Sequence, residues 1–89
     1  MLNKLLKWLN GPDIVDFGNG YKEWYLNGKL HRKNGPAVDF GNGHKEWYLN
    51  GKLHREDGPA IEYSDGRKGW YLNGEKVTEE TVRKLGKMK

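Results

Sequence analysis

A chain of 89 residues is long enough for one small domain, and its hydrophobic fraction of 35% supplies only a thin core. The absence of cysteine excludes disulfides and thiolate metal sites, and no stretch is long and apolar enough to predict a membrane span. The net charge of +4 comes from 16 basic and 12 acidic residues that are interspersed, which favours a solvated surface over a dedicated nucleic-acid patch. We therefore expect one cytoplasmic domain.

Residues 1–10 predict an amphipathic helix. Four leucines recur at helical spacing with two lysines between them: Leu2, Leu5, Leu6 and Leu9. Gly11-Pro12 would end this helix. It would cover one end of a repeat array, although a helix that binds a membrane surface or a partner is the alternative. Four leucines against two lysines favour packing on the protein.

Three copies of a 23-residue unit follow. Residues 15–32 and 38–55 are identical except for Tyr21 in the first copy and His44 in the second. The third copy is more diverged but keeps its Trp-Tyr-Leu-Asn-Gly run at 70–74. The repeat region covers residues 11–77. We assign the repeats to residues 11–34, 35–57 and 58–80, and the end of the third repeat overlaps the expected C-terminal helix.

Asn-Gly and Asp-Gly dipeptides recur through these repeats and predict hairpin turns, because such turns need residues with positive φ. The segments between them are short and rich in Val, Ile, Phe, Tyr and Trp, which is typical of strands. The frequent glycines exclude a helix across residues 11–75. The sequence thus predicts a mainly β protein, an antiparallel meander of hairpin repeats with a short helix capping each end.

The second copy shows the expected unit. It predicts strands at 36–40 and 44–49 around the turn Gly41-Asn42-Gly43, and then the turn Asn50-Gly51 before a short strand at 52–55. Residues 52–55 form either a third strand or the first part of one long bent strand. The repeat therefore has three strands or two.

The pairing register has two alternatives. A three-residue turn places Asp39 opposite Lys45, whereas a two-residue turn places Asp39 opposite Glu46 but gathers more apolar residues on one face. Each effect is worth roughly 0.2–1 kcal/mol per pair, so both registers remain open, and we favour the charge-paired one. That register puts Val38, Phe40, Tyr48 and Leu53 on one face, and Trp47, Leu49 and His54 on the other.

The chain is expected to end in a helix at residues 78–86. Thr78 can serve as the N-cap, and Gly86 as the stop after Leu85. Val77 and Val82 stand at the positions of a hydrophobic staple.

The repeat resembles the MORN-repeat variant family. The resemblance lies in Trp24-Tyr25-Leu26-Asn27-Gly28-Lys29-Leu30 and in its counterpart at 47–53, and it covers residues 11–77. The run His54-Arg55-Glu56-Asp57-Gly58-Pro59-Ala60 is similar to a phage-associated form of the repeat. The third copy departs from it, with Glu75-Lys76-Val77 and no His-Arg. The resemblance implies an elongated, twisted antiparallel sheet used for binding, with no shared enzymatic activity.

Candidates for chemistry are few. His31 and His54 occupy equivalent positions in separate repeats, so we expect them to lie apart and to be structural. Three histidines without cysteine at ligand spacing are a weak metal signal. The Gly-Asn-Gly runs are not followed by a helix, so they predict hairpin turns and not a phosphate site. We expect no catalytic residue, metal or cofactor.

The aromatic residues predict a binding surface. Trp47 and Tyr48 are adjacent and must point to opposite faces of a strand, and a single-layer sheet cannot bury both faces. We therefore expect a partner-binding surface with Lys33 on its rim, made by residues Trp24, Trp47, Trp70, Tyr25, Tyr48, His31, His54, Arg32, Arg55, Lys29 and Lys52.

Together these features predict a small non-enzymatic binding protein. The phage-like form of the repeat points to an inhibitor of a host protein or defence system, similar in role to an anti-CRISPR protein. A nucleic-acid-binding module and an antitoxin-like partner of a toxin are the alternatives. The exposed strand edges fit either a monomer or a homodimer.

Overall fold

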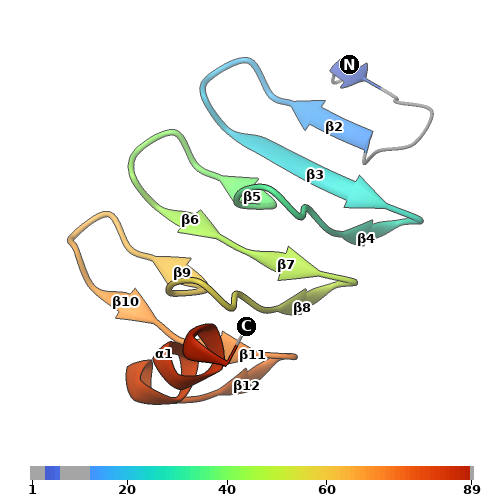
Figure 1. The fold of residues 1–89 in the computed structure, drawn as a ribbon. Helices are drawn as coiled ribbons and strands as arrows, with labels where there is room; N and C mark the ends of the chain where they lie inside the picture. Colours follow the sequence, from blue (N-terminus) through green and yellow to red (C-terminus); the bar gives the residue numbers. More distant parts are fainter. Residues whose placement is uncertain (1–3, 7–12, 89) are drawn as a thin grey trace.

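The computed structural model describes residues 4–6 and 13–88 (Figure 1). It is mainly β, with antiparallel strands arranged as three hairpin units stacked side by side and one helix at the C-terminal end, which confirms the predicted fold class. The first unit contains β2 (Asp13–Asp16), β3 (Lys22–Leu26) and β4 (Lys29–Leu30). The second contains β5 (Val38–Asp39), β6 (Lys45–Glu46), β7 (Tyr48–Leu49) and β8 (Lys52–Leu53). The third contains β9 (Ile61–Glu62), β10 (Lys68–Gly69), β11 (Tyr71–Leu72) and β12 (Glu75–Lys76).

The main sheet has the order β1-β2-β3-β5-β6-β9-β10, where β1 is Lys4–Leu6. Asp39 pairs with Lys45 inside the second unit, which confirms the charge-paired register. Between units, Lys22 pairs with Asp39 and Lys45 pairs with Glu62. Acidic and basic residues therefore alternate across the sheet, and a one-residue slip would break every one of these pairs.

Two kinds of turn shape each unit. The Gly41-Asn42-Gly43 loop is closed by the Phe40 N–H, which donates to the His44 carbonyl at 3.0 Å. The second kind is the Asn-Gly turn, in which both residues have positive φ, as at Asn50 (52°) and Gly51 (81°). This geometry is that of the two-residue hairpin turn. It makes β8 a strand of its own, which excludes the two-strand form of the repeat. The first unit has three strands, and the second and third units have four, because their long strand is interrupted at Trp47 and Trp70.

Each long strand changes its pairing partner at a tryptophan. The Trp47 N–H donates to the Ala60 carbonyl of the third unit at 2.7 Å, while the Trp47 carbonyl accepts from the His54 N–H at 3.0 Å. Before Trp47 the strand therefore pairs with β5 of its own unit and with β9 of the next unit, and after Trp47 it pairs with β8. The alanines at these junctions, Ala37 and Ala60, are fully buried.

The core is small. Its buried apolar side chains are Ala37, Val38, Ala60, Ile61 and Val82, and no large side chain of residues 13–88 is fully buried. The tryptophans at 24, 47 and 70 are half-buried, and Phe17 and Phe40 are each 40% exposed. The expectation that the aromatic rings cannot all be buried is confirmed.

The prediction of a helix at residues 1–10 is wrong for the three of these residues that the structure describes. Lys4–Leu6 is strand β1, which lies antiparallel to β2 with Lys4 opposite Asp16, and not part of a helix. The rest of the expected helix lies outside the described residues. A helix of ten residues is marginal by itself, whereas a strand here gains hydrogen bonds along the open edge of β2.

The C-terminal helix α1 spans Glu79–Lys87. The Thr78 side chain accepts from the Thr81 N–H at 3.1 Å, as expected of the N-cap. Gly86 does not end the helix, which continues to Lys87, because a glycine followed by residues with helical φ and ψ does not impose a stop.

Gly41→Ala tests how tightly the hairpin tips stack. Gly41 has φ of +80°, and a Cβ there would lie 2.9 Å from the Gly20 carbonyl atoms. Gly18 is the equivalent residue of the first unit, with φ of +87° and nothing within 4 Å of its Cβ position. We expect Gly18→Ala to cost about 1 kcal/mol from φ strain, and Gly41→Ala at least about 2 kcal/mol in urea unfolding. Equal losses would contradict close stacking.

Candidate functional site

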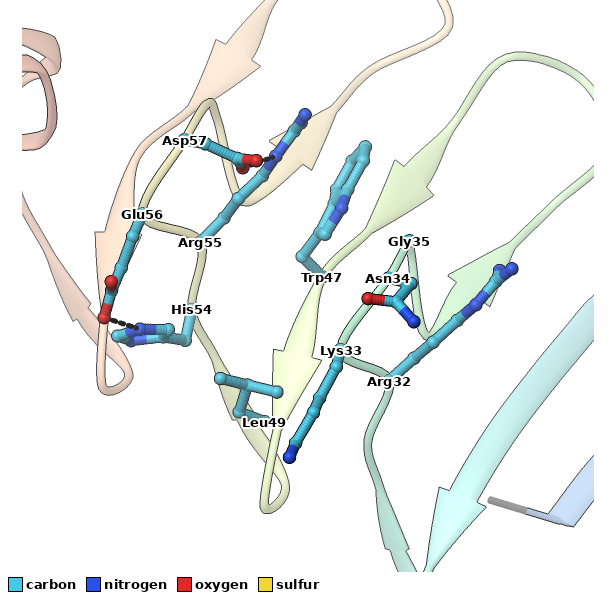
Figure 2. A pocket seen from close by; sticks show the side chains of 10 residues that line it. All are labelled: Arg32, Lys33, Asn34, Gly35, Trp47, Leu49, His54, Arg55, Glu56 and Asp57. Atoms are coloured by element: carbon cyan, nitrogen blue, oxygen red, sulfur yellow. Dashed lines mark hydrogen bonds and ion pairs between the residues drawn. The ribbon is translucent and has the colours of Figure 1, made fainter. Parts of the chain in front are cut away.

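A groove of about 710 Å³ lies between two loops on the tryptophan face of the second unit (Figure 2). Trp47 and Leu49 form its floor. One wall is the loop after β4, residues 32–35, and the other is the loop after β8, residues 54–57. The residues that line it are Arg32, Lys33, Asn34, Gly35, Trp47, Leu49, His54, Arg55, Glu56 and Asp57. Because the walls come from consecutive repeats, the groove exists only when the repeats stack.

The two walls carry opposite charge. The first holds Arg32 and Lys33 and no acid, while the second holds Arg55 with Glu56 and Asp57. The two repeats are otherwise nearly identical. The difference in charge between the walls therefore arises from two positions, where the first repeat has Lys33 and Asn34 and the second has Glu56 and Asp57. Lys33 is exposed and makes no ion pair with any residue of 13–88. The first wall is therefore available to an anionic group.

An arginine lies over a tryptophan in each wall. The Arg55 guanidinium is 3.9 Å from the centroid of the Trp47 ring, and Arg32 is 4.0 Å from Trp24. A Cβ on Gly35 would lie 2.9 Å from Arg32 Cζ, so glycine is required for the arginine to fold back over the indole. Gly58 plays the same part beside Arg55.

The two arginines differ in how many acceptors they have. Arg55 donates to the Pro59 carbonyl at 3.1 Å, to Asp57 at 2.9 Å and to Glu62 at 3.3 Å. Arg32 donates to the Pro36 carbonyl at 3.1 Å, and it forms no ion pair within residues 13–88. Burial lowers the pKa of Arg32 from its usual value, an effect that Asp39 opposes, but a guanidinium stays charged at neutral pH. Arg32 thus has fewer acceptors than Arg55, and its guanidinium lies over Trp24 and points away from Trp47 (Figure 2).

The histidines connect successive repeats. His31 Nδ1 accepts from the Asn50 N–H at 2.9 Å, and His54 Nδ1 accepts from the Asn73 N–H at 2.9 Å. His31 is only 7% exposed, so its ring offers little surface to a partner. His54 lines the groove, and its Nε2 lies 3.0 Å from Glu56. These contacts give both rings a structural role, because each ring joins one repeat to the Asn-Gly turn of the next.

The groove gathers five of the residues that the sequence assigned to a binding surface or its rim: Arg32, Lys33, Trp47, His54 and Arg55. The others lie elsewhere. Lys29 runs beside Gly51 of the next repeat and Lys52 beside Gly74, so both pack on turns. The sequence reasoning missed the other lining residues, which are Asn34, Gly35, Leu49, Glu56 and Asp57. The charge difference between the two nearly identical copies is the signal that could have found the acidic wall.

Tyr25 and Tyr48 belong to the opposite face. The Tyr25 hydroxyl donates to Glu23 at 2.7 Å, and the Tyr48 hydroxyl donates to Glu46 at 2.9 Å. The hydrogen bond to Glu23 raises the pKa of Tyr25, and burial with the bond to Glu46 raises that of Tyr48. These hydroxyls are engaged within the sheet.

A column of stacked rings runs along the same face near the hairpin tips. Its centroid distances are 4.8, 5.0, 4.6 and 5.3 Å through Phe17, Tyr21, Phe40, His44 and Tyr63. Arg67 ends the column 4.7 Å from the Tyr63 centroid. Tilted and edge-on rings at these distances attract one another, so the column joins the three units.

No protein-family model matches the chain, and no curated protein or solved structure matches it. In the part of the chain that the structure describes, no helix has the length and apolarity to cross a membrane. Among the same residues, no group of histidine and carboxylate side chains is placed to hold a metal ion.

His31→Leu tests the contact between repeats. It leaves the Asn50 N–H without its acceptor, so we expect a loss of about 1–3 kcal/mol in urea unfolding and faster hydrogen exchange of that amide. His31→Asn is the control, because its side-chain oxygen can take the place of Nδ1 and should recover part of the loss. Unchanged exchange at Asn50 in His31→Leu would contradict this role.

Glu23→Gln tests the charge environment of the tyrosines. The hydrogen bond to Glu23 raises the pKa of Tyr21 to about 12. The raised pKa favours the protonated form in the folded state, so the stability it contributes is present below pH 10 and is lost between pH 10 and 12. We expect Glu23→Gln to move the Tyr21 titration toward pH 10 in tyrosinate absorbance. Glu75→Gln is the control and should leave the tyrosine titration unchanged. An unchanged titration curve in Glu23→Gln would refute the role of Glu23 in raising the pKa of Tyr21.

Proposed function

We propose that this chain is a non-enzymatic binding protein that receives a segment of another protein in the groove over Trp47. One observation carries the proposal: a half-buried tryptophan and a leucine form the floor of an open groove between a basic and an acidic wall. Tryptophan and arginine are the residues that most often dominate binding energy at protein interfaces. Walls of opposite charge favour one partner and one orientation, which is the basis of specificity.

The resemblance of the repeat to a phage-associated MORN variant supports a narrower role. On this basis we propose an inhibitor of a host protein or defence system, with a function like that of an anti-CRISPR protein. A net charge of +4 argues against a mimic of DNA, which would need a strongly acidic surface. Steric occlusion of a protein partner fits the groove better. An antitoxin-like role would use the same groove on a toxin.

Lys33→Glu and Lys29→Glu form a matched pair that tests the groove. Both lysines are exposed and both variants change the net charge equally, but only Lys33 lines the groove. The tagged chain and its variants are purified from the native host. We expect a stoichiometric protein partner to co-purify with the wild type and with Lys29→Glu. The affinity of Lys33→Glu for this partner should fall at least about tenfold.

Binding to nucleic acid would give a different pattern. Both variants would then weaken binding to a similar extent, and affinity would fall steeply with salt because phosphate neutralisation releases counterions. The proposed function would be refuted if both variants lost affinity equally and if treatment with nuclease removed the bound partner.

A further inference from the structure

The start of α1 corresponds to an arginine of the earlier repeats. Thr78 lies 23 residues after Arg55, and the Val77 N–H before it donates to the Trp70 carbonyl at 2.9 Å. The His54 N–H makes the same bond to the Trp47 carbonyl in the second repeat, at 3.0 Å. The helix thus begins where the earlier repeats place a wall of the groove.

The end of α1 lies at the other wall. A Cβ on Gly86 would be 4.0 Å from the Glu56 carbonyl oxygen, so the last turn of the helix reaches the loop after β8. The helix therefore runs from the end of the third unit to the loop after β8 of the second unit. It lies at the C-terminal end of the array (Figure 1). The place that a groove would have beside Trp70 is bridged by a helix of nine residues.

The buried side of this helix is a narrow apolar stripe. Val82 is 2% exposed, and Leu85 one turn later is half-buried. Glu79 and Arg83 pair with each other on the exposed side. The fold itself thus shows that a short amphipathic helix can close the space between two stacked repeats.

We propose that the groove between the first two repeats receives an amphipathic helix of about three turns from a partner protein, in the orientation of α1. The proposal rests on the proposed function and names the kind of partner. Within residues 13–88 no helix of this chain covers Trp47 and Leu49. The strands and loops around these two residues are equivalent to those that α1 spans in the third repeat. A helix laid into an apolar groove is a recurrent mode of peptide recognition.

Charge fixes the orientation of this helix. Laid in the direction of α1, it begins beside Glu56 and Asp57, whose positions Glu79 and Glu80 take in the third repeat, and it ends beside Lys33. A helix has a partial positive charge at its N-terminus and a partial negative charge at its C-terminus, so each end meets a wall of opposite sign.

Charge also separates a partner from a second copy of this chain. The last turn of α1 carries Lys84 and Lys87, and it lies near Glu56 in its own position. In the groove, those lysines would meet Lys33, which repels them. The partner helix therefore has an acidic last turn.

Two stapled peptides test the proposal on the full chain. Both have the sequence of residues 78–87 with a covalent staple in place of the exposed Glu79–Arg83 pair, and one also carries Lys84→Glu and Lys87→Glu. Fluorescence anisotropy measures their affinity, and NMR follows the indole N–H signals of the tryptophans. We expect the acidic peptide to bind about tenfold more tightly than the lysine peptide at low salt, with a shift at Trp47 and none at Trp70.

Lys33→Glu supplies the control and should reverse the order of the two peptides. Failure of the acidic peptide to saturate at millimolar concentration, an unchanged order in Lys33→Glu, or a shift at Trp70 in place of Trp47 would overturn the inference. If Lys33→Glu releases the native partner while neither peptide binds, the proposed function stands and the helical occupant is wrong. If Lys33→Glu retains the native partner, the proposed function itself is wrong.

Discussion

The fold depends on hydrogen bonds that one repeat makes to the Asn-Gly turn of the next. With both turn residues at positive φ, the Asn50 N–H donates to His31, and the Gly51 N–H donates to the Leu30 carbonyl at 2.8 Å. The Arg32 N–H returns a bond to the Tyr48 carbonyl at 3.1 Å. A single hairpin unit has no such partners and is marginal in water, so each unit needs its neighbour. The same bonds set the spacing of the groove walls.

The stacking also explains why so little apolar surface is enough. The buried core consists of small and β-branched residues at the junctions between units, and the large rings lie half-buried over it. Alternating charges across the sheet fix the register, while the arginines cover the tryptophans and tie the loops to the strands. Polar contacts and ring stacking therefore hold the strands and loops in place, as a larger hydrophobic core would do in a bigger domain.

Near-identity of the repeats makes their few differences informative. Stacking of two identical units would give walls of the same charge. Lys33 and Asn34 stand where the next repeat has Glu56 and Asp57, and this contrast gives the groove a positive and a negative side. Under the proposed function, binding specificity would arise from these differences between neighbouring repeats, because many of the shared residues take part in stacking. The third repeat carries this further by replacing a wall with α1.

The sequence by itself determined the features that depend on neighbours a few residues apart. The Asn-Gly turns and the Thr78 cap follow from local geometry. The charges of Asp39 and Lys45 favoured their pairing, although the sequence left a second register open. Contacts between repeats decided the rest. The leucine spacing of residues 1–10 suits a helix, yet the open edge of β2 draws Lys4–Leu6 into a strand. Likewise, the role of His31 and the groove over Trp47 depend on residues about 20 positions apart, whose distance is set only when the repeats stack.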